Sequence, residues 1–433
     1  MKKLFSISAA LLLAGASLFA QDRSKVLKIY NWSDYIDEEI LKEFPVWYKE
    51  QTGEDIEIVY QLFDINEVML AKIEKGKADF DVVCPSDYMI ERMLNHGLLL
   101  PINKDFGDTP SYLDNVSPFF RDAFKNKLKA PAGVDVNDYA VGYMWGTTGF
   151  LYNTKYVKPE EVSTWGAILN PRFENKIFMK DAPRDVYSPL LIYIHPEVTN
   201  LDSLMFSTSD EDIAAVEKIL VDAKPNIAGW EADFGKEMMT QEKAWLNWTW
   251  SGDAAWAMQE AADVNVELDY IVPEEGSTYW FDGWVIPKYA QNIKAASYFI
   301  NYMCQSEMAI RNMDATGYVS VIGTPEVLES VQESAIENGF TQTYDVSYLF
   351  GEDGKEVIVD PVYYPSQEIM DRCALEHDAD EDTIKLLKMW QRVKGDNLST
   401  PIIIIIVLVV LAIVFFAVKS VGKKGKNAKK TKK

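Results

Sequence analysis

Apolar residues near the start of the chain alternate between two patterns. Residues 26–30 (VLKIY), 56–60 (IEIVY) and 81–84 (DVVC) are short, mostly apolar runs, which is typical of strands with a buried face. Residues 37–51, which are acidic at their start, and residues 66–75 are predicted helices between these strands. This strand–helix–strand–helix–strand order predicts a mostly parallel sheet with right-handed crossovers. The fold class is therefore α/β.

A tryptophan-rich segment, WLNWTWSGDAAW at residues 245–256, combines a strand pattern with a helix pattern. Large apolar residues alternate with smaller or polar ones up to Trp250, and strong helix formers follow. This order places Trp250 and Asp253 at the carboxyl end of a strand, where open α/β sheets bind their ligands. An aromatic face beside an ionised acid attracts an organic cation. For Trp245 and Trp248 we favour a position in the core instead.

The pattern changes in the middle of the chain. Residues 139–153 (YAVGYMWGTTGFLYN) alternate like a pair of strands with glycine-rich breaks, which predicts a crossing from one lobe into another. Residues 341–365 are aromatic and rich in turn residues, and their pattern predicts no defined element. A final helix is predicted at residues 381–394.

The two ends of the chain carry export and membrane signals. Residues 1–20 combine two lysines, an apolar run and small residues, which predicts a secretory signal peptide cut after Ala16 or Ala20. Residues 402–418 are uninterruptedly apolar and precede a lysine-rich tail at 419–433, which predicts one C-terminal transmembrane helix with the tail in the cytoplasm. We therefore expect an exported domain on the periplasmic, extracytoplasmic face of the inner membrane, anchored by that helix.

The charge balance and the cysteine and histidine content exclude several classes of partner. The formal net charge is −23 although the tail is rich in lysine, so the exported part is strongly acidic. Such a surface argues against nucleic acid as a partner. The three cysteines and three histidines lie far apart and show no metal-ligand spacing. We therefore expect no metal and no cofactor.

Several motifs in order along the chain resemble those of the bacterial periplasmic spermidine/putrescine-binding proteins, the extracytoplasmic components of polyamine ABC importers. The resemblance extends from about Leu27 to Lys394 and rests on IYNWSDYI, FDVVCPSDY, YMWGTTGFLYN, KDAPRDVY, WSGDAAW, VPEEGSTYWFDGWVIP and ATGYVS. It implies a two-lobed, type II periplasmic binding protein fold with a ligand cleft between the lobes and hinge closure on binding. The expected division is a first lobe at 25–137 and 270–322 and a second lobe at 138–269 and 323–396.

The resemblance also implies which residues contact the ligand. Each is carried over from the motif that it matches. Among the basic residues, these motifs place Arg184 near the implied contacts, and the sequence leaves its direction open. The implied ligand-binding residues are Trp32, Ser33, Asp34, Tyr35, Ser86, Tyr88, Asp181, Asp185, Trp250, Asp253, Trp280, Asp282 and Tyr318. Asp181 has an alternative role as the cap of the helix that follows it.

The physical chemistry of a polyamine fits these residue types. A polyamine is a flexible hydrocarbon chain with an ammonium group at each end, so its binder needs separated carboxylates and flat aromatic walls. We therefore expect a protein that captures putrescine or spermidine and delivers it to an ABC permease, and the motifs fit both ligands.

Two other functions are compatible with parts of the pattern. One is a membrane-tethered polyamine sensor, and the other is a hydrolase that acts on carbohydrate, because tryptophans and paired acids also line glycosidase clefts. The sequence lacks a Gly-x-Ser-x-Gly elbow, a His-Glu-x-x-His motif and a P-loop. We therefore expect that the protein is not an enzyme.

Overall fold

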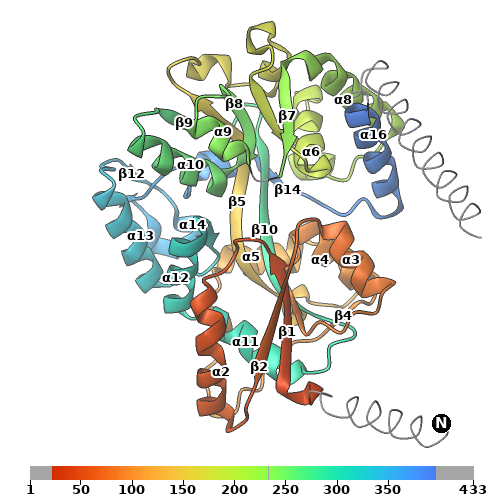
Figure 1. The fold of residues 1–433 in the computed structure, drawn as a ribbon, viewed down its shortest axis with the longest axis vertical. Helices are drawn as coiled ribbons and strands as arrows, with labels where there is room; N and C mark the ends of the chain where they lie inside the picture. The colour runs from red at the N-terminus through yellow and green to blue at the C-terminus, as the bar shows by residue number, and fades with distance from the viewer. Residues whose placement is uncertain (1–21, 233, 396–433) are drawn as a thin grey trace, which may run out of the picture.

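The computed structural model describes residues 22–232 and 234–395. Their strands and helices form two α/β lobes, one above the other in Figure 1, joined by the long strands β5 (Ala140–Asn153) and β10 (Ser277–Pro287). The predicted two-lobed α/β architecture is confirmed.

The first lobe is built on three parallel strands from the start of the chain. β1 (Val26–Trp32) lies between β2 (Glu57–Phe63) and β3 (Val82–Val83) and pairs in parallel with both. α2 (Glu38–Thr52) connects β1 to β2, and α3 (Asn66–Glu74) connects β2 to β3. The predicted order of strands and helices in this part of the chain is confirmed.

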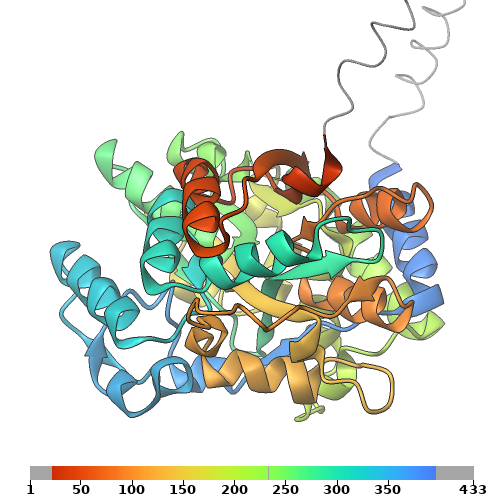
Figure 2. The ribbon, with the colours of Figure 1, turned by 90° about the horizontal axis from the view of Figure 1, so that it is seen from below.

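Helix α2 is held on the first lobe by aromatic packing. It lies beside α11 (Ile293–Met303) in both views (Figures 1 and 2). Phe44 packs edge-on against Phe299 with ring centroids 5.2 Å apart, and the Trp47 and Tyr302 centroids are 4.8 Å apart. The turn between β1 and α2 carries the first predicted ligand motif. It therefore connects a strand inside the sheet to a helix that packs against the first lobe.

Strand β5 is one continuous strand in which all 14 residues are buried. The prediction of two strands with a glycine-rich break is wrong. The first part of β5 pairs antiparallel with β10, and residues 148–153 pair with β8 (Leu246–Trp250) and β9 (Leu268–Ile271) in the second lobe. The glycines make room for large neighbours instead of breaking the strand: a Cβ at Gly146 would lie 2.8 Å from the Trp280 ring.

The second lobe surrounds a parallel group of three strands. β6 (Ile177–Lys180) pairs in parallel with both β7 (Ile227–Glu231) and β8. Trp248 is fully buried against Trp165, with ring centroids 4.1 Å apart, which confirms its predicted position in the core. The helices of this lobe are α6 (Pro183–Ile194), α8 (Asp210–Ala223), α9 (Gly235–Thr240), α10 (Ser251–Asp263) and α16 (Thr383–Gly395).

The division between the lobes differs from the predicted one after residue 323. The prediction assigns residues 323–396 to the second lobe. In the structure, Val327 of α13 (Pro325–Glu337) belongs to the hydrophobic core of the first lobe, whereas Leu386 of α16 belongs to the core of the second. The reason is that α13 packs against α12 and β13, so the chain returns to the second lobe only near its end.

The remaining elements are short, or their sequence pattern did not predict them. Helix α12 directly follows α11 and is an example of an unpredicted element, and the unassigned region 341–365 holds a two-stranded ribbon and a short helix. These elements are α4 (Asp87–Asn95), β4 (Leu99–Leu100), α5 (Pro118–Asp122), α7 (Leu201–Leu204), α12 (Ser306–Thr316), β11 (Val319–Ser320), β12 (Thr343–Tyr344), α14 (Ser347–Phe350), β13 (Val357–Ile358), α15 (Gln367–Met370) and β14 (Cys373–Leu375).

The predicted signal peptide and the predicted transmembrane segment at 402–418 lie outside the described residues. Within residues 22–232 and 234–395, none of the helices combines the length and the apolar character needed to cross a membrane.

Substitution of Gly149 by alanine should destabilise the protein, because the added methyl group has no space where β5 enters the second lobe. Its Cβ would lie 2.5 Å from the carbonyl oxygen of Ile271 and 2.6 Å from the Tyr270 ring. We expect the free energy of unfolding to fall by about 1–3 kcal/mol, as measured by urea denaturation. The control is Gly395→Ala, where a Cβ meets nothing within 4 Å. Equal losses in the two variants would contradict the packing described for β5.

Candidate ligand-binding site

A belt of aromatic side chains lies where the two lobes meet. Trp250 ends β8, Trp280 lies on β10, Tyr318 precedes β11, and Tyr35 follows β1. Neighbouring ring centroids along this belt are 6.2 Å apart for Trp250 and Trp280, 5.7 Å for Trp280 and Tyr318, and 5.2 Å for Tyr318 and Tyr35. Four predicted site residues that are far apart in the sequence are thus brought into one cluster.

Asp282 is a buried carboxyl group with one unused oxygen. It lies on β10 and is 5% exposed, and its Oδ2 accepts a hydrogen bond of 2.8 Å from the Tyr35 hydroxyl. Its Oδ1 is buried and has no hydrogen-bond partner among the described residues. Burial raises the pKa of Asp282 to about 7, although hydrogen bonding from the Ser86 and Tyr35 side chains lowers it, and the nearby charge of Asp185 acts in the same direction as burial. This oxygen is therefore an acceptor that a ligand donor can use.

Asp185 is positioned by the tryptophans of β8. It lies in the first turn of α6, and its Oδ1 accepts a hydrogen bond of 2.9 Å from Trp250 Nε1. Trp248 Nε1 donates to the Asp185 backbone carbonyl at 3.1 Å. Burial raises the pKa of Asp185, although the hydrogen bond from Trp250 opposes this effect. The carboxyl group and the indole ring are therefore held as one unit on the second lobe.

Asp253 differs from the other two because its charge is already paired. Lys180 Nζ lies 2.6 Å from its Oδ2, the Tyr318 hydroxyl donates to Oδ1 at 2.9 Å, and Lys236 Nζ lies 3.6 Å from Oδ1. Burial alone would raise the pKa of Asp253, but the two ammonium groups outweigh it and hold the pKa below its usual value. Asp253 is thus an ionised carboxylate within the belt.

The first-lobe wall of the site is formed by Trp32, Ser86 and Tyr88. Trp32 Nε1 donates to the Cys84 carbonyl at 2.9 Å, while Asn66 Nδ2 donates to Ser86 Oγ at 3.0 Å and to the Tyr88 hydroxyl at 3.2 Å. Ser86 also forms an isolated β-bridge with Asp282. These side chains are fixed by the lobe and face the acidic cluster.

Arg184 points into the cleft. Its guanidinium group lies 5.1 Å from the centroid of the Tyr88 ring, and the residue is buried. Because Arg184 belongs to the second lobe and Tyr88 to the first, this contact also shows that the lobes touch in the described structure. The cluster therefore contains cations from the chain as well as carboxyl groups.

Three predicted residues lie apart from the cluster. Ser33 and Asp34 are exposed on the turn after β1, and Asp34 has a φ of 51°. Asp181 accepts a hydrogen bond of 2.8 Å from Trp390 and pairs with Lys394, so its side chain faces α16. The alternative role of Asp181 as a helix cap is also not observed, since Ala182 occupies the cap position.

Two buried carboxyl groups of the site were missed by reasoning from the sequence. Asp87 begins α4 and Glu376 follows β14, and both are almost fully buried. Burial raises the pKa of each well above its usual range, and the charge of Asp185 acts in the same direction on both. Asp87 stands directly after Ser86 in a recognised motif, but an acid in the first turn of a helix usually stabilises the helix end.

The lobes also contact each other beside the cluster. Glu91 of α4 and His377 are buried together with Oε2 and Nδ1 3.0 Å apart, and Arg92 lies 2.6 Å from Asp378. The segment that carries His377 and Asp378 leads into α16 of the second lobe. The segment that leads into the second lobe is therefore held against α4 of the first lobe next to the buried acidic residues.

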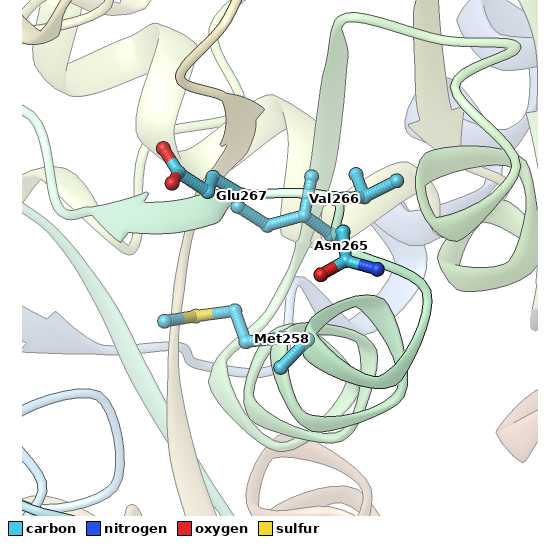
Figure 3. A pocket seen from close by; sticks show the side chains of 6 residues that line it. Met258, Asn265, Val266 and Glu267 are labelled. Carbon is cyan, nitrogen blue, oxygen red and sulfur yellow. The ribbon is translucent and has the colours of Figure 1, made fainter.

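A separate cavity of about 400 Å³ lies in the second lobe, away from this cluster (Figure 3). It is lined by Met258, Ala262, Asn265, Val266, Glu267 and Leu268, which belong to the C-terminal half of α10 and the connection to β9. Asp253 lies at the opposite end of α10. Because this cavity contains a single carboxylate and no aromatic wall, it does not have the features of the interlobe cluster.

Comparison with known proteins gives consistent results. The family model for bacterial extracellular solute-binding proteins matches residues 47–338. The spermidine/putrescine-binding periplasmic protein of Escherichia coli K12 is 28% identical over 313 residues, which are 72% of this chain and 82% of that protein. The putrescine-binding periplasmic protein PotF of the same organism is 29% identical over 344 residues, which are 76% of this chain and 86% of that protein.

Similarity to solved structures extends over the described lobes. The spermidine/putrescine ABC transporter substrate-binding protein PotD from Streptococcus pneumoniae is 29% identical and gives a TM-score of 0.62. The match covers 86% of this chain and 99% of that protein.

The raised pKa of Asp282 predicts a specific pH dependence of stability. The folded state holds the proton more tightly than the unfolded chain, whose carboxyl pKa is near 3.8, so the free energy of unfolding should fall as the pH rises from about 4 to about 7. Asp282→Asn should remove this pH-dependent part of the free energy of unfolding, which is on the order of 3 kcal/mol. Urea denaturation of both proteins across this pH range measures the difference. Parallel curves for the two proteins would show that Asp282 does not titrate as described.

Proposed function

The chain belongs to the family of bacterial extracellular solute-binding proteins, and from this premise we propose that it captures putrescine or spermidine outside the cytoplasm and delivers it to the permease of an ABC importer. The names of its relatives support a polyamine as the ligand. The observation that carries the proposal is Asp282, a buried carboxyl group with a free acceptor oxygen beside an aromatic belt.

An ammonium group satisfies the requirements of this site. It donates the hydrogen bond that Asp282 Oδ1 lacks, and it supplies the positive charge that a buried carboxylate needs. The faces of Trp280 and Tyr318 attract the same cation and pack against the methylene chain between two ammonium groups. Asp185 is the proposed second anion for the ligand. Its carboxylate is close enough to Asp282 for its charge to raise the pKa of Asp282.

The proposed site extends over both lobes. On the first lobe it includes Asp282 and Tyr35, with Trp32, Ser33 and Asp34 as its outer rim. The contacts of Asp181 with α16 support a structural role for that residue. The other proposed ligand contacts are Ser86, Tyr88, Asp185, Trp250, Trp280 and Tyr318. Asp253 contributes an ionised carboxylate to the belt with its charge paired by Lys180, and Asp87 and Glu376 are buried carboxyl groups whose pKa values are raised.

The environment of the acids also favours binding over hydrolysis. A glycosidase needs a general acid with a raised pKa, which Asp282 would provide, opposite a second carboxylate that is free to act as base or nucleophile. Asp253, the ionised acid of the belt, is bound by Lys180 and by the Tyr318 hydroxyl. Asp185 accepts a hydrogen bond from Trp250 Nε1, and burial raises its pKa, so it does not match an ionised base or nucleophile either. We therefore propose a protein that binds its ligand without chemical change, and a sensor role would use the same site.

We further propose that residues 402–418 anchor the exported domain to the inner membrane after a signal peptide at 1–20 has directed its export. The support for this part is the apolar run and its lysine-rich flank in the sequence.

Binding of a polyamine should depend strongly on Asp282. Titration calorimetry should give one-to-one binding of putrescine or spermidine and no heat with an uncharged disaccharide. Asp282→Asn should weaken binding on the order of 100-fold, because it removes the charge that faces the ammonium group. Asp181→Asn is the matched control and should leave the dissociation constant unchanged. If no polyamine binds, or if the two variants behave alike, the proposed function or the proposed site is wrong.

The membrane anchor predicts where protease can act on intact spheroplasts. Protease added outside should release the acidic domain from the membrane fraction, and a chain truncated after Leu398 should be recovered without membranes. Protection of the domain from the added protease would contradict the proposed orientation.

A further inference from the structure

Lys180 is an unusually placed lysine. It is the last residue of β6, its side chain is 1% exposed, and its Nζ donates to the Ala232 carbonyl at 2.9 Å. The same Nζ lies 2.6 Å from Asp253 Oδ2 and 4.2 Å from the centroid of the Trp250 ring. Glu231 Oε1, which is also buried, lies 3.4 Å from the same Nζ. A buried ammonium group of the chain therefore contacts two carboxylates, the nearer of them Asp253, and an indole face.

These two contacts are the ones that the proposed site offers to an ammonium group of the ligand. An indole face together with a carboxylate binds an organic cation, and Lys180 already makes both contacts with Trp250 and Asp253. Lys180 thus supplies, from the protein itself, the group that a polyamine end would supply. A second ammonium group brought to Asp253 would be repelled by Lys180 and by Lys236, whose Nζ lies 3.6 Å from Asp253 Oδ1.

We propose that Lys180 is a specificity-determining residue: it fills the ammonium position at Asp253 and limits the site to a diamine, so that putrescine binds more tightly than spermidine. This inference rests on the proposed function. Each buried ammonium group needs a carboxylate of its own, because removal of an ion from water is compensated only by a well-placed opposite charge.

The charges in the cluster agree with this limit. Asp282 and Asp185 remain available as the two main anions for the ligand, while Asp253 is paired with Lys180. Burial raises the pKa of Glu376 well above its usual range, so this carboxyl group holds its proton and adds little negative charge beside Asp185. The site therefore matches two ammonium groups better than three.

The test compares variants of the full-length chain, purified in detergent, by titration calorimetry with putrescine and with spermidine. The wild-type protein should bind putrescine more tightly. Lys180→Met should free Asp253 for a third ammonium group and shift the ratio of the two dissociation constants toward spermidine on the order of tenfold. Lys28→Met is the control, because Lys28 pairs with Asp79 in the first lobe, and it should leave the ratio unchanged.

Lys236→Met tests whether lysines at Asp253 limit the site to a diamine, and it leaves the ion pair between Lys180 and Asp253 intact. The side chain of Lys236 is partly exposed, so this variant should fold even if Lys180→Met does not, and it should shift the ratio toward spermidine by a smaller factor. Tighter binding of spermidine by the wild type, or an unchanged ratio in the folded variants, would overturn the role of Lys180 while leaving polyamine binding intact. Failure of every protein to bind either ligand would instead overturn the proposed function together with this inference.

Discussion

Burial of negative charge between two lobes is the constraint on which this structure depends. Carboxyl groups inside a protein lose the solvation of water, and each needs a proton, a cation or strong hydrogen bonds in compensation. The carboxyl groups of this cluster are stabilised in two different ways. Asp253 is paired with Lys180, whereas Asp282, Asp87 and Glu376 have pKa values raised by burial. In the proposed function, an ammonium group of the ligand compensates the buried Asp282 carboxylate, and its binding therefore stabilises the contact between the lobes.

The scaffold explains why these groups can be held so close together. The first part of β5 pairs antiparallel with β10, with an irregular register between Phe281 and Gly283, so Trp280 and Asp282 lie on a strand rather than on a loop. The second lobe presents Trp250 at the end of β8 and Asp253 in the first turn of α10, where the helix dipole favours an ionised acid. The lobes meet again where Glu91 contacts His377. Both lobes therefore contribute residues to one cluster, each from a strand, a helix or a turn next to a strand.

Much of this arrangement could be predicted from the sequence, and the exceptions share a physical reason. The strand-to-helix transition at Trp250 was visible because it depends on local patterns, and the family motifs indicated Tyr35, Asp282 and Tyr318. The pairing of Lys180 with Asp253 joins residues 73 positions apart, and the contacts of Asp181 with α16 span more than 200 positions. Such pairings are set by tertiary packing. The continuity of β5 was missed for a related reason, because its glycines are explained by neighbours such as Trp280 that are remote in the sequence.

In the proposed mode of binding, a ligand ammonium group replaces the proton of Asp282, so the protein should release a proton when the ligand binds. Titration calorimetry with putrescine at a pH of about 6, in two buffers with different ionisation enthalpies, gives the number of protons released. Because burial raises the pKa of Asp282 to about 7 in the free protein, most molecules carry the proton at this pH. We expect the wild-type protein to release close to one proton per ligand and Asp282→Asn to release much less. Tight binding without proton release would contradict this mode of binding.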